Sequence, residues 1–386
     1  MEESKESRRV VRTFSWASFL NDMGSDMIFA IWPIFVTSFT GVNMQILGLI
    51  DGIGDALVSV SQAVSGYVSD RLRKRKFFIW TGYSFAVISR IGYAFSTTWQ
   101  WLIPFRIIDR SGKMRGSPRD AIIADVSTDE NRGRNFGFLR MMDNLGAVFG
   151  IIFSILLIQY LGYKTVFMIA TIPSILATLL VIFFIKERPL AGAKLFKGIR
   201  LSNLSKNFRL FLLLSTIFAL GSFSYSFLLI YAKNFGFSVA FVPVLYLIFT
   251  VVASIFSIPF GKLVDKIGRK KVVGISFLAW ALTCLSLIFI RSYFGLILIF
   301  ILYGIHLSAK DVSQRTFVSE LVPAEFRASG LGGFQMVVGL AAFPSSFFAG
   351  FLWERVGILT PLYVSLGLTI VAFFMLMFVK DTKKVF

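Results

Sequence analysis

Long runs of apolar residues alternate with short polar segments along the whole chain. A helix needs roughly 20 mostly apolar residues to cross a bilayer. Twelve stretches of suitable length and hydropathy are residues 14–39, 44–69, 77–95, 99–118, 135–160, 163–185, 208–232, 238–261, 272–290, 294–314, 329–352 and 358–379. The pattern predicts an all-α polytopic membrane protein with twelve transmembrane helices, since barrel strands would instead give short segments of alternating polarity.

One long polar break, residues 186–209, separates the first six predicted spans from the last six. It predicts an N-terminal six-helix bundle at 1–188, a cytoplasmic linker at 189–207 and a C-terminal six-helix bundle at 208–386. The first apolar run continues past the length of a signal peptide, so we expect it to be retained as a span.

Composition and charge place the chain in a membrane. The chain is 56% hydrophobic with a mean hydropathy of +0.74 and a net charge of +19. In a soluble protein this charge would suggest nucleic acid, but membrane proteins collect Lys and Arg in their cytoplasmic loops. With both termini placed in the cytoplasm, the outer side carries Lys164, Lys233, Arg291 and Arg355. We therefore expect a multi-pass protein of the cytoplasmic (inner) membrane, with both termini cytoplasmic, surrounded by a lipid bilayer and binding no nucleic acid.

The stretch "FRIIDRSGKMRGSPRD" at 105–120 is highly charged, so it could be a water-exposed loop or a helix in the membrane. If the span at 99–118 did not cross, every later loop would change sides and the charge asymmetry would invert. The loop charges therefore predict that this stretch crosses the membrane.

The two halves repeat one another at an offset of 195 residues. Matched pairs are Gly66 with Gly261, Asp70 with Asp265, Arg71 with Lys266, Asp125 with Glu320, Glu130 with Glu325, Arg132 with Arg327, and Gly137 with Gly332. This many matches at one offset indicates two copies of a six-span unit, a construction common in secondary transporters. The charged stretch aligns with the apolar segment that starts at 294, which again predicts a membrane helix.

A signature lies between the second and third spans of each copy. "GKLVDKIGRKK" at 261–271 fits the pattern Gly-x-x-x-Asp-Arg/Lys-x-Gly followed by basic residues, and "GYVSDRLRKRK" at 66–76 fits except that Arg73 replaces the second glycine. On these motifs the chain resembles the Major Facilitator Superfamily of secondary transporters over essentially its whole length. The resemblance implies two pseudo-symmetric six-helix bundles, a central cavity lined mainly by helices one, four, seven and ten, and alternating access by rocking of the halves.

The signature residues are predicted to form a gate. Glycine at 66 and 261 lets a neighbouring backbone approach closely, and aspartate at 70 and 265 can meet basic residues or a helix N-terminus. Such contacts can hold one gate shut and break in the other state; the alternative is simple anchoring by positive charge. The gating set is Gly66, Asp70, Arg71, Gly261, Asp265, Lys266, Gly268 and Arg269.

Most of the charged residues inside the N-terminal spans have no charged counterpart at the offset of 195; Arg115, which aligns with Lys310, is an exception. A charge at mid-bilayer costs about 2.5–3.5 kcal/mol or more, so these side chains must face one another or a wet cavity. The six acids are Asp22, Asp26, Asp51, Asp55, Asp109 and Asp143, and the six bases are Arg90, Arg106, Arg110, Lys113, Arg115 and Arg140. We predict that they are neighbours around a shared aqueous pocket; purely structural ion pairing is the alternative.

Helical spacing assigns roles within this set. Asp22 and Asp26 share one helix face, as do Asp51 and Asp55. A cavity carboxylate that exchanges a proton for a basic partner can couple proton movement to transport, so these four are the predicted proton-coupling residues.

Helix four supplies the predicted solute anchors. Its charged residues share a face, and a guanidinium matches carboxylate or phosphate, which favours an anionic or zwitterionic solute. Substrate-binding candidates in this half are Asn21, Arg106, Asp109, Arg110 and Lys113. The buried charge network is completed by Arg90, Arg115, Arg140 and Asp143.

The C-terminal half offers Tyr225, His306 and Lys310 as further substrate-binding candidates. Tyr225 could hydrogen-bond a solute or merely the helix backbone. His306 could sense a proton near neutral pH, or be a hydrogen-bonded part of the core. A single histidine and a single cysteine, Cys284, do not supply the four ligands of a zinc site, so we expect no metal and no cofactor.

The predicted function is secondary active transport of a small polar solute by alternating access, proton-coupled, by a monomer that is not an enzyme. Alternatives are a multidrug/proton antiporter, a lipid flippase of the same fold, a receptor or scaffold, and a membrane-embedded phosphoalcohol transferase. Gly146 and Gly150 fit a helix-five exporter motif, but Ile151 stands in place of its proline. The transferase pattern lacks an arginine after Ala56 and has Lys74 where it needs an acid.

Overall fold

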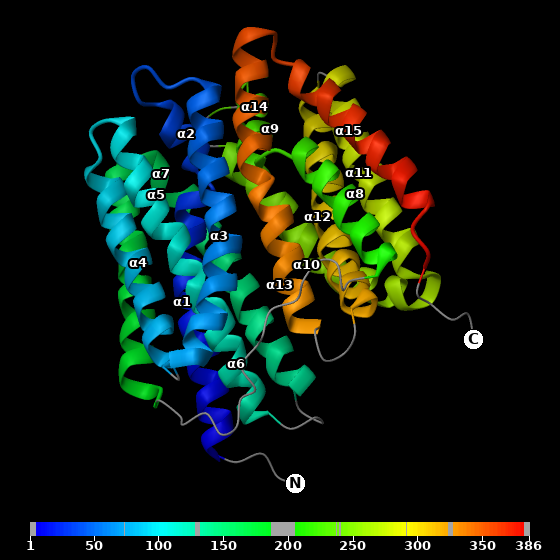
Figure 1. The fold of residues 1–386 in the computed structure, drawn as a ribbon. Helices are drawn as coiled ribbons and strands as arrows, with labels where there is room; N and C mark the ends of the chain where they lie inside the picture. The colour runs from blue at the N-terminus through cyan, green and yellow to red at the C-terminus, as the bar shows by residue number, and fades with distance from the viewer. Residues whose placement is uncertain are drawn as a thin grey trace. The chain divides into compact units, whose positions relative to one another are not determined.

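A computed structural model describes residues 5–72, 74–127, 132–186, 205–236, 238, 241–290, 292–322 and 327–381. In that part of the chain every regular element is a helix (Figure 1). The chain divides into two compact units, Met1–Thr40 with Leu57–Phe196 and Gly41–Ala56 with Lys197–Phe386. Gly41–Ala56, which belongs to the predicted N-terminal bundle, clusters with the second unit. The predicted linker falls almost wholly outside the described residues.

The first unit holds the helices of the first six predicted spans. They are α1 (Lys5–Phe29), α2 (Trp32–Thr37), the second half of α3 (Met44–Leu72), α4 (Arg75–Phe95), η1 (Trp99–Trp101), α5 (Leu102–Ser111), η2 (Gly112–Arg115), α6 (Gly116–Val126) and α7 (Arg132–Phe184). The fifth and sixth spans join inside α7 at Gly162, whose φ of +68° breaks the helical path. Glycine adopts such a left-handed conformation without the clash that a Cβ would cause.

The charged stretch is helical, as the sequence predicted. Helix α5, the 3-10 turn η2 and helix α6 follow one another without a gap, so the fourth span continues to Val126, past the predicted end at 118. A 3-10 turn inside an α-helix often marks strain or a functional hinge. Here it coincides with the charged residues Lys113 and Arg115.

The second unit holds the first half of α3 and the helices of the last six predicted spans. The latter are α8 (Lys206–Gly221), α9 (Tyr225–Asn234), α10 (Val242–Ile267), α11 (Arg269–Phe289), α12 (Tyr293–Leu321), α13 (Arg327–Leu340), α14 (Ala342–Arg355) and α15 (Thr360–Met377). The seventh span is α8 with α9, and the eleventh is α13 with α14. By length and composition, eight helical segments of the described chain could cross a membrane. One of them contains both spans of α7, and the charged first, third and fourth spans lie outside this set.

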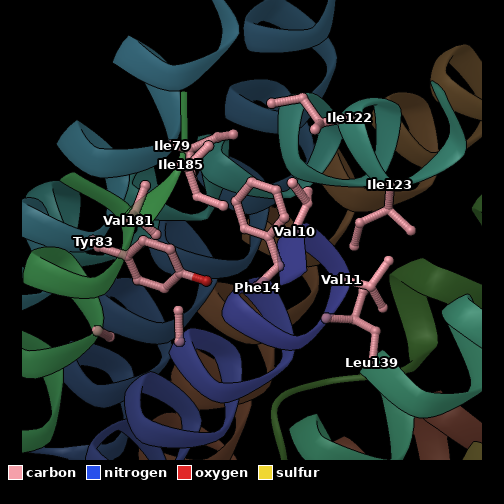
Figure 2. Close-up of a cluster of buried hydrophobic side chains, with 12 residues drawn as sticks. Val10, Val11, Phe14, Ile79, Tyr83, Ile122, Ile123, Leu139, Val181 and Ile185 are labelled. Atoms are coloured by element: carbon pink, nitrogen blue, oxygen red, sulfur yellow. The ribbon is translucent and has the colours of Figure 1, made fainter. Parts of the chain in front are cut away.

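An apolar cluster ties four helices of the first unit together. Figure 2 shows Val10, Val11 and Phe14 of α1 surrounded by side chains of α4, α6 and α7. Because lipid tails are as apolar as these side chains, close van der Waals packing rather than escape from water holds such helices together. The cluster fixes α1 as the central element against which the charged fourth span is placed.

Small residues let α7 approach α1 closely (Figure 1). A Cβ added to Gly146 would overlap the backbone carbonyl of Phe19, and one added to Gly150 would overlap that of Met23. Glycine at such positions allows backbones to meet within a membrane bundle. The glycines of the apparent exporter motif therefore have a packing function in this chain.

Arg90 of α4 joins three helices from a fully enclosed position. Its side chain is 1% exposed, and it donates to the carbonyls of Asn21 and Ala170 at 3.0 and 2.9 Å. It also donates to the hydroxyl of Ser25 at 2.8 Å and to that of Ser174. The guanidinium spreads its charge over four neutral oxygens, so Arg90 acts as a fixed cross-link between α1, α4 and α7.

In the second unit, the first half of α3 packs on α9 and α14 through small residues. A Cβ at Gly48 would overlap the backbone of Ser346, and one at Gly350 would overlap that of Met44. The backbone N–H of Met44 donates to Glu354 at 2.7 Å. These contacts explain why this segment belongs to the second unit.

We expect Gly150→Ala to lower the melting temperature of the purified protein, because the added methyl must push α7 away from α1. Gly137→Ala is the matched control, since a Cβ there meets open space among the described residues and alanine favours an exposed helix by about 1 kcal/mol. Thermal unfolding in detergent measures both. A Gly150→Ala protein as stable as the Gly137→Ala protein would contradict this packing.

We expect Arg90→Met to destabilise the first unit by at least about 2 kcal/mol, because several buried oxygens lose a charged donor. Arg209→Met, at an exposed position of α8, should cost under about 1 kcal/mol. Denaturant or thermal unfolding compares the two. Equal stability of both variants would show that Arg90 is not a cross-link.

Candidate functional site

Asp22 of α1 faces two cations of the fourth span. Its Oδ1 lies 4.0 Å from Lys113 Nζ and 3.7 Å from the Arg115 guanidinium, and it accepts a hydrogen bond from Asn21 Nδ2 at 3.1 Å. The side chains of Asp22 and Lys113 are 22% and 30% exposed, whereas that of Arg115 is 7% exposed. A single carboxylate oxygen is thus shared between two bases and remains partly accessible.

A second cluster closes into a ring of alternating charge. Arg119 donates to Asp120 at 2.9 Å, Asp120 lies 3.5 Å from Arg140, Arg140 donates to Asp143 at 3.2 Å, and Asp143 lies 3.8 Å from Arg119. Two acids and two bases make the ring neutral. It connects α6 to α7 and resembles a structural clamp more than a site for a charged ligand.

Two uncharged side chains connect this ring to the Asp22 cluster. Arg119 donates to the hydroxyl of Ser18 at 2.5 Å, and Ser18 lies 3.3 Å from the hydroxyl of Tyr83. The guanidinium of Arg115 lies over the Tyr83 ring, 4.8 Å from its centroid. These contacts form a continuous path from Arg115 through Tyr83 and Ser18 to the ring.

The earlier turns of the fourth span carry further charges. Arg106 lies 4.4 Å from the centroid of the Trp32 ring, and Arg110 lies 4.4 Å from that of Phe29. Asp109 accepts from Ser89 at 3.4 Å and lies 3.9 Å from Arg110. All three charged side chains are at most 8% exposed, so aromatic rings and neighbouring helices cover them in this conformation.

Two of the predicted network members belong elsewhere. Asp51 and Asp55 lie in the second unit, where buried Asp51 accepts from the Ser224 hydroxyl at 2.8 Å. That they share a pocket with the acids of the first unit stays a prediction. Helical spacing alone could not assign the first half of α3 to a unit, because that depends on the packing of Gly48 and Gly350.

The division into units also divides the predicted set of charges. The first unit holds its six bases and four of its six acids. The additional pair Arg119 and Asp120 is neutral. Counted within the first unit alone, the set has two more bases than acids.

Arg90 was predicted to belong to a buried charge network. It donates to the four neutral oxygens described above, and Asp109, Asp22 and Asp26 act on it electrostatically. Two other predictions need adjustment. Arg140 was predicted to be buried, yet its side chain is 53% exposed. Asn21 was predicted to bind solute, yet it is 0% exposed and its amide is occupied by Asp22 and by Ser174, which donates to it at 3.2 Å. Asn21 therefore supports Asp22 in this conformation.

The candidates of the second unit are mostly enclosed. His306 is fully buried, with Nδ1 2.8 Å from the carbonyl of Ser276 and with Trp280 and Tyr303 against its ring. Half-buried Tyr225 packs on Tyr246 and Phe249, and Lys310 is half-buried. The arrangement of His306 is that of a hydrogen-bonded core histidine.

Asp26 lies one turn after Asp22 on α1 and is half-buried. It is close enough to Lys113 to interact with it electrostatically. The two acids predicted for helix one therefore both act on the same lysine.

The two signature segments make equivalent ion pairs. Arg75 at the start of α4 lies 2.5 Å from Asp125 near the end of α6, and Arg269 at the start of α11 lies 2.5 Å from Glu320 near the end of α12. Asp125 and Glu320 are partners in the sequence repeat. Each pair joins the turn of the signature to the end of the fourth span of its unit.

The signature glycines differ between the two copies. A Cβ at Gly66 would lie 3.2 Å from Ser117, whereas one at Gly261 would meet open space among the described residues, so the predicted close approach occurs in one copy. Gly268 has a φ of +99° in the turn after α10, which favours glycine. Arg73 and the side chains of Asp70 and Asp265 lie outside the described residues, and Arg71 and Lys266 are exposed.

Sequence reasoning missed the ring partners Arg119 and Asp120. Both residues stood in the charged stretch, but the hydropathy window ended the fourth span at 118. Their spacing from Lys113 and Arg115 would have placed them on the same continued helix. The described residues contain no group of three or more His, Cys, Asp or Glu side chains positioned to hold a metal ion.

Comparisons with known proteins agree with this architecture. The family model of the Major Facilitator Superfamily matches residues 14–228 and 210–385. An uncharacterised MFS-type transporter of Methanocaldococcus jannaschii is 37% identical, over 98% of this chain and 96% of its own.

Solved structures share the fold at low sequence identity. The nucleoside transporter NupG superimposes with a TM-score of 0.77 at 19% identity, over 95% of this chain and 98% of its own. A D-xylose-proton symporter superimposes with a TM-score of 0.76 at 18% identity, over 98% of both chains. The chain therefore belongs to the Major Facilitator Superfamily and is a secondary transporter rather than an enzyme.

Proposed function

We propose that the protein moves a small anionic or zwitterionic solute across the cytoplasmic membrane by alternating access, coupled to protons through Asp22. The observation that supports this most is the sharing of Asp22 Oδ1 between Lys113 and Arg115. Asp26 also acts on Lys113, so the two acids balance the two bases until Asp22 takes up a proton, which leaves a positive remainder. An anion can complement that charge, and a cationic drug would be repelled by it.

The coupling follows from competition for the same cations. Ionised Asp22 engages Lys113 and Arg115, so an anionic solute must share them. When Asp22 takes up a proton, its negative charge disappears, so Arg115 becomes available to the solute and Lys113 is shared with Asp26 alone. Proton and solute therefore favour each other's binding, and by linkage the effect is reciprocal. Such a pair of ligands crosses the membrane in the same direction.

The other charges constrain this exchange. Asp26 lies on the same helix face and acts on Lys113, so it shares the task of holding the cation when Asp22 is neutral. The neutral ring that contains Arg119 and Asp143 lies at the end of the charged cluster farthest along the fourth span from Arg110. In the preceding turns of the fourth span, the charges of Arg110 and Asp109 face each other.

The proposal also covers the orientation of the protein in the membrane and its oligomeric state. The asymmetry of Lys and Arg between the two sides supports cytoplasmic termini, and the matching ion pairs at Arg75 and Arg269 then lie on the cytoplasmic side. There they stabilise the turns of the proposed gate. We take the transporting unit to be a monomer, since each cluster described above is completed within one chain.

We expect Asp22→Asn to abolish uphill uptake driven by a pH gradient in proteoliposomes, while exchange of labelled for unlabelled solute continues. The amide cannot accept a transported proton, but the cations remain. A screen of organic anions, amino acids, sugars and cationic dyes supplies the solute. Asp311→Asn, at an exposed position of α12, is the matched control and should retain uphill uptake. Full pH-driven accumulation by Asp22→Asn would refute the assignment.

We expect Lys113→Gln to weaken solute binding about tenfold or more, because a hydrogen bond to a charged group contributes about 1.5–3 kcal/mol. Lys164→Gln changes an exposed lysine of α7 that lies over the Phe95 ring and should leave affinity unchanged. Equilibrium binding of labelled solute to purified protein measures both. An equal effect of the two substitutions would place the solute elsewhere.

A further inference from the structure

A groove of about 660 Å³ lies on the first unit, between the N-terminal half of α1 and the C-terminal end of α7. It is separate from the Asp22 cluster, and the proposed transport does not use it. Its basic lining consists of Lys5, Arg8, Arg9 and Arg12, and its apolar lining includes Trp16, Leu20, Leu180 and Phe184.

The face of α1 that lines the groove is basic at one end and apolar at the other. Lys5, Arg9 and Arg12 recur at three and four residues, and Trp16 and Leu20 continue the same row. The opposite face of the helix is buried in the apolar cluster of Figure 2. The groove therefore begins with positive charge and continues as an exposed apolar surface.

The basic end brings like charges close together. Lys5 and Arg9 are i, i+4 neighbours, and like charges at that spacing destabilise a helix. An anion bound at this end would relieve the repulsion.

The apolar end is suited to a hydrocarbon chain. The side chains of Trp16 and Phe184 are 52% and 48% exposed. The guanidinium of Arg9 lies 5.7 Å from the centroid of the Phe184 ring, where the basic and apolar parts of the groove meet. Residues 5 to 20 of a helix span about 22 Å, which is close to the thickness of one bilayer leaflet with its head groups.

We propose that this groove binds one anionic membrane phospholipid. Arg9 and Arg12 hold its phosphate, and one acyl chain lies along Trp16, Leu180 and Phe184. Basic pockets between membrane helices are suited to anionic head groups. A free phosphate would use the cationic end but leave the apolar wall exposed, so the combination of both ends favours the lipid.

The test uses the full chain in detergent, titrated with phosphatidylglycerol or phosphatidylcholine whose acyl chains are brominated. Bromine quenches nearby tryptophan, and subtracting the signal of Trp16→Phe isolates the groove. We expect phosphatidylglycerol to bind about 25-fold more tightly than phosphatidylcholine, since each of the two arginines attracts anionic lipid by about a factor of five. The double variant Arg9→Gln, Arg12→Gln should lose this preference.

Lys206→Gln with Lys262→Gln is the matched control, because both lysines are exposed and lie in the second unit; it should keep the preference. Melting temperatures establish that all variants are folded. Equal binding of the two lipids, or equal losses in both double variants, would overturn the proposal. Inorganic phosphate that stabilises the wild-type protein as strongly as phosphatidylglycerol would also overturn it, because the groove would then bind a free anion. Self-association of the protein through this face would overturn it as well.

Discussion

The central constraint on this protein is that a charge inside a membrane must be compensated by the protein itself. Asp22 meets this constraint by sharing one oxygen between Lys113 and Arg115. These contacts favour an arrangement in which α1 and the fourth span lie opposite each other. The apolar cluster around Phe14 and the close approach of α7 at Gly150 hold α1 in the position that this pairing requires.

The charged residues of the first unit fall into two classes with different physical roles. Arg90 is enclosed and donates to neutral oxygens, so its charge is constant and its contacts are structural. Asp22 and Lys113 are partly exposed and paired with each other, so their interaction can respond to a proton or an anion. A transporter needs both classes, because a site that changes its charge state must be supported by neighbours that do not.

Much of the architecture could be predicted from sequence, because helix length and apolar periodicity are local properties. The helical nature of 105–120 followed from loop charges and from the internal repeat, although hydropathy alone gave an ambiguous answer. The break between the fifth and sixth spans coincided with Gly162, a residue that tolerates positive φ. The ion pairs at Asp125 and Glu320 had a sequence signal in the repeat.

The rest depended on tertiary packing that spacing does not encode. Asp51 and Asp55 share a helix face, but small residues at Gly48 and Gly350 place that segment in the second unit. The ring at Arg119 was missed because a hydropathy window stops at charged residues, whereas this helix continues through them. Identifying Arg90 as a cross-link required knowledge of which backbone carbonyls surround it.

The central claim, that Asp22 exchanges its two cations for a proton when an anion binds, is tested most directly by counting protons during binding. Calorimetry of solute binding in buffers of different ionisation enthalpy gives that number. The account predicts uptake of about one proton per solute bound by the wild-type protein and none by Asp22→Asn. Binding without proton uptake, or equal uptake by both proteins, would contradict it.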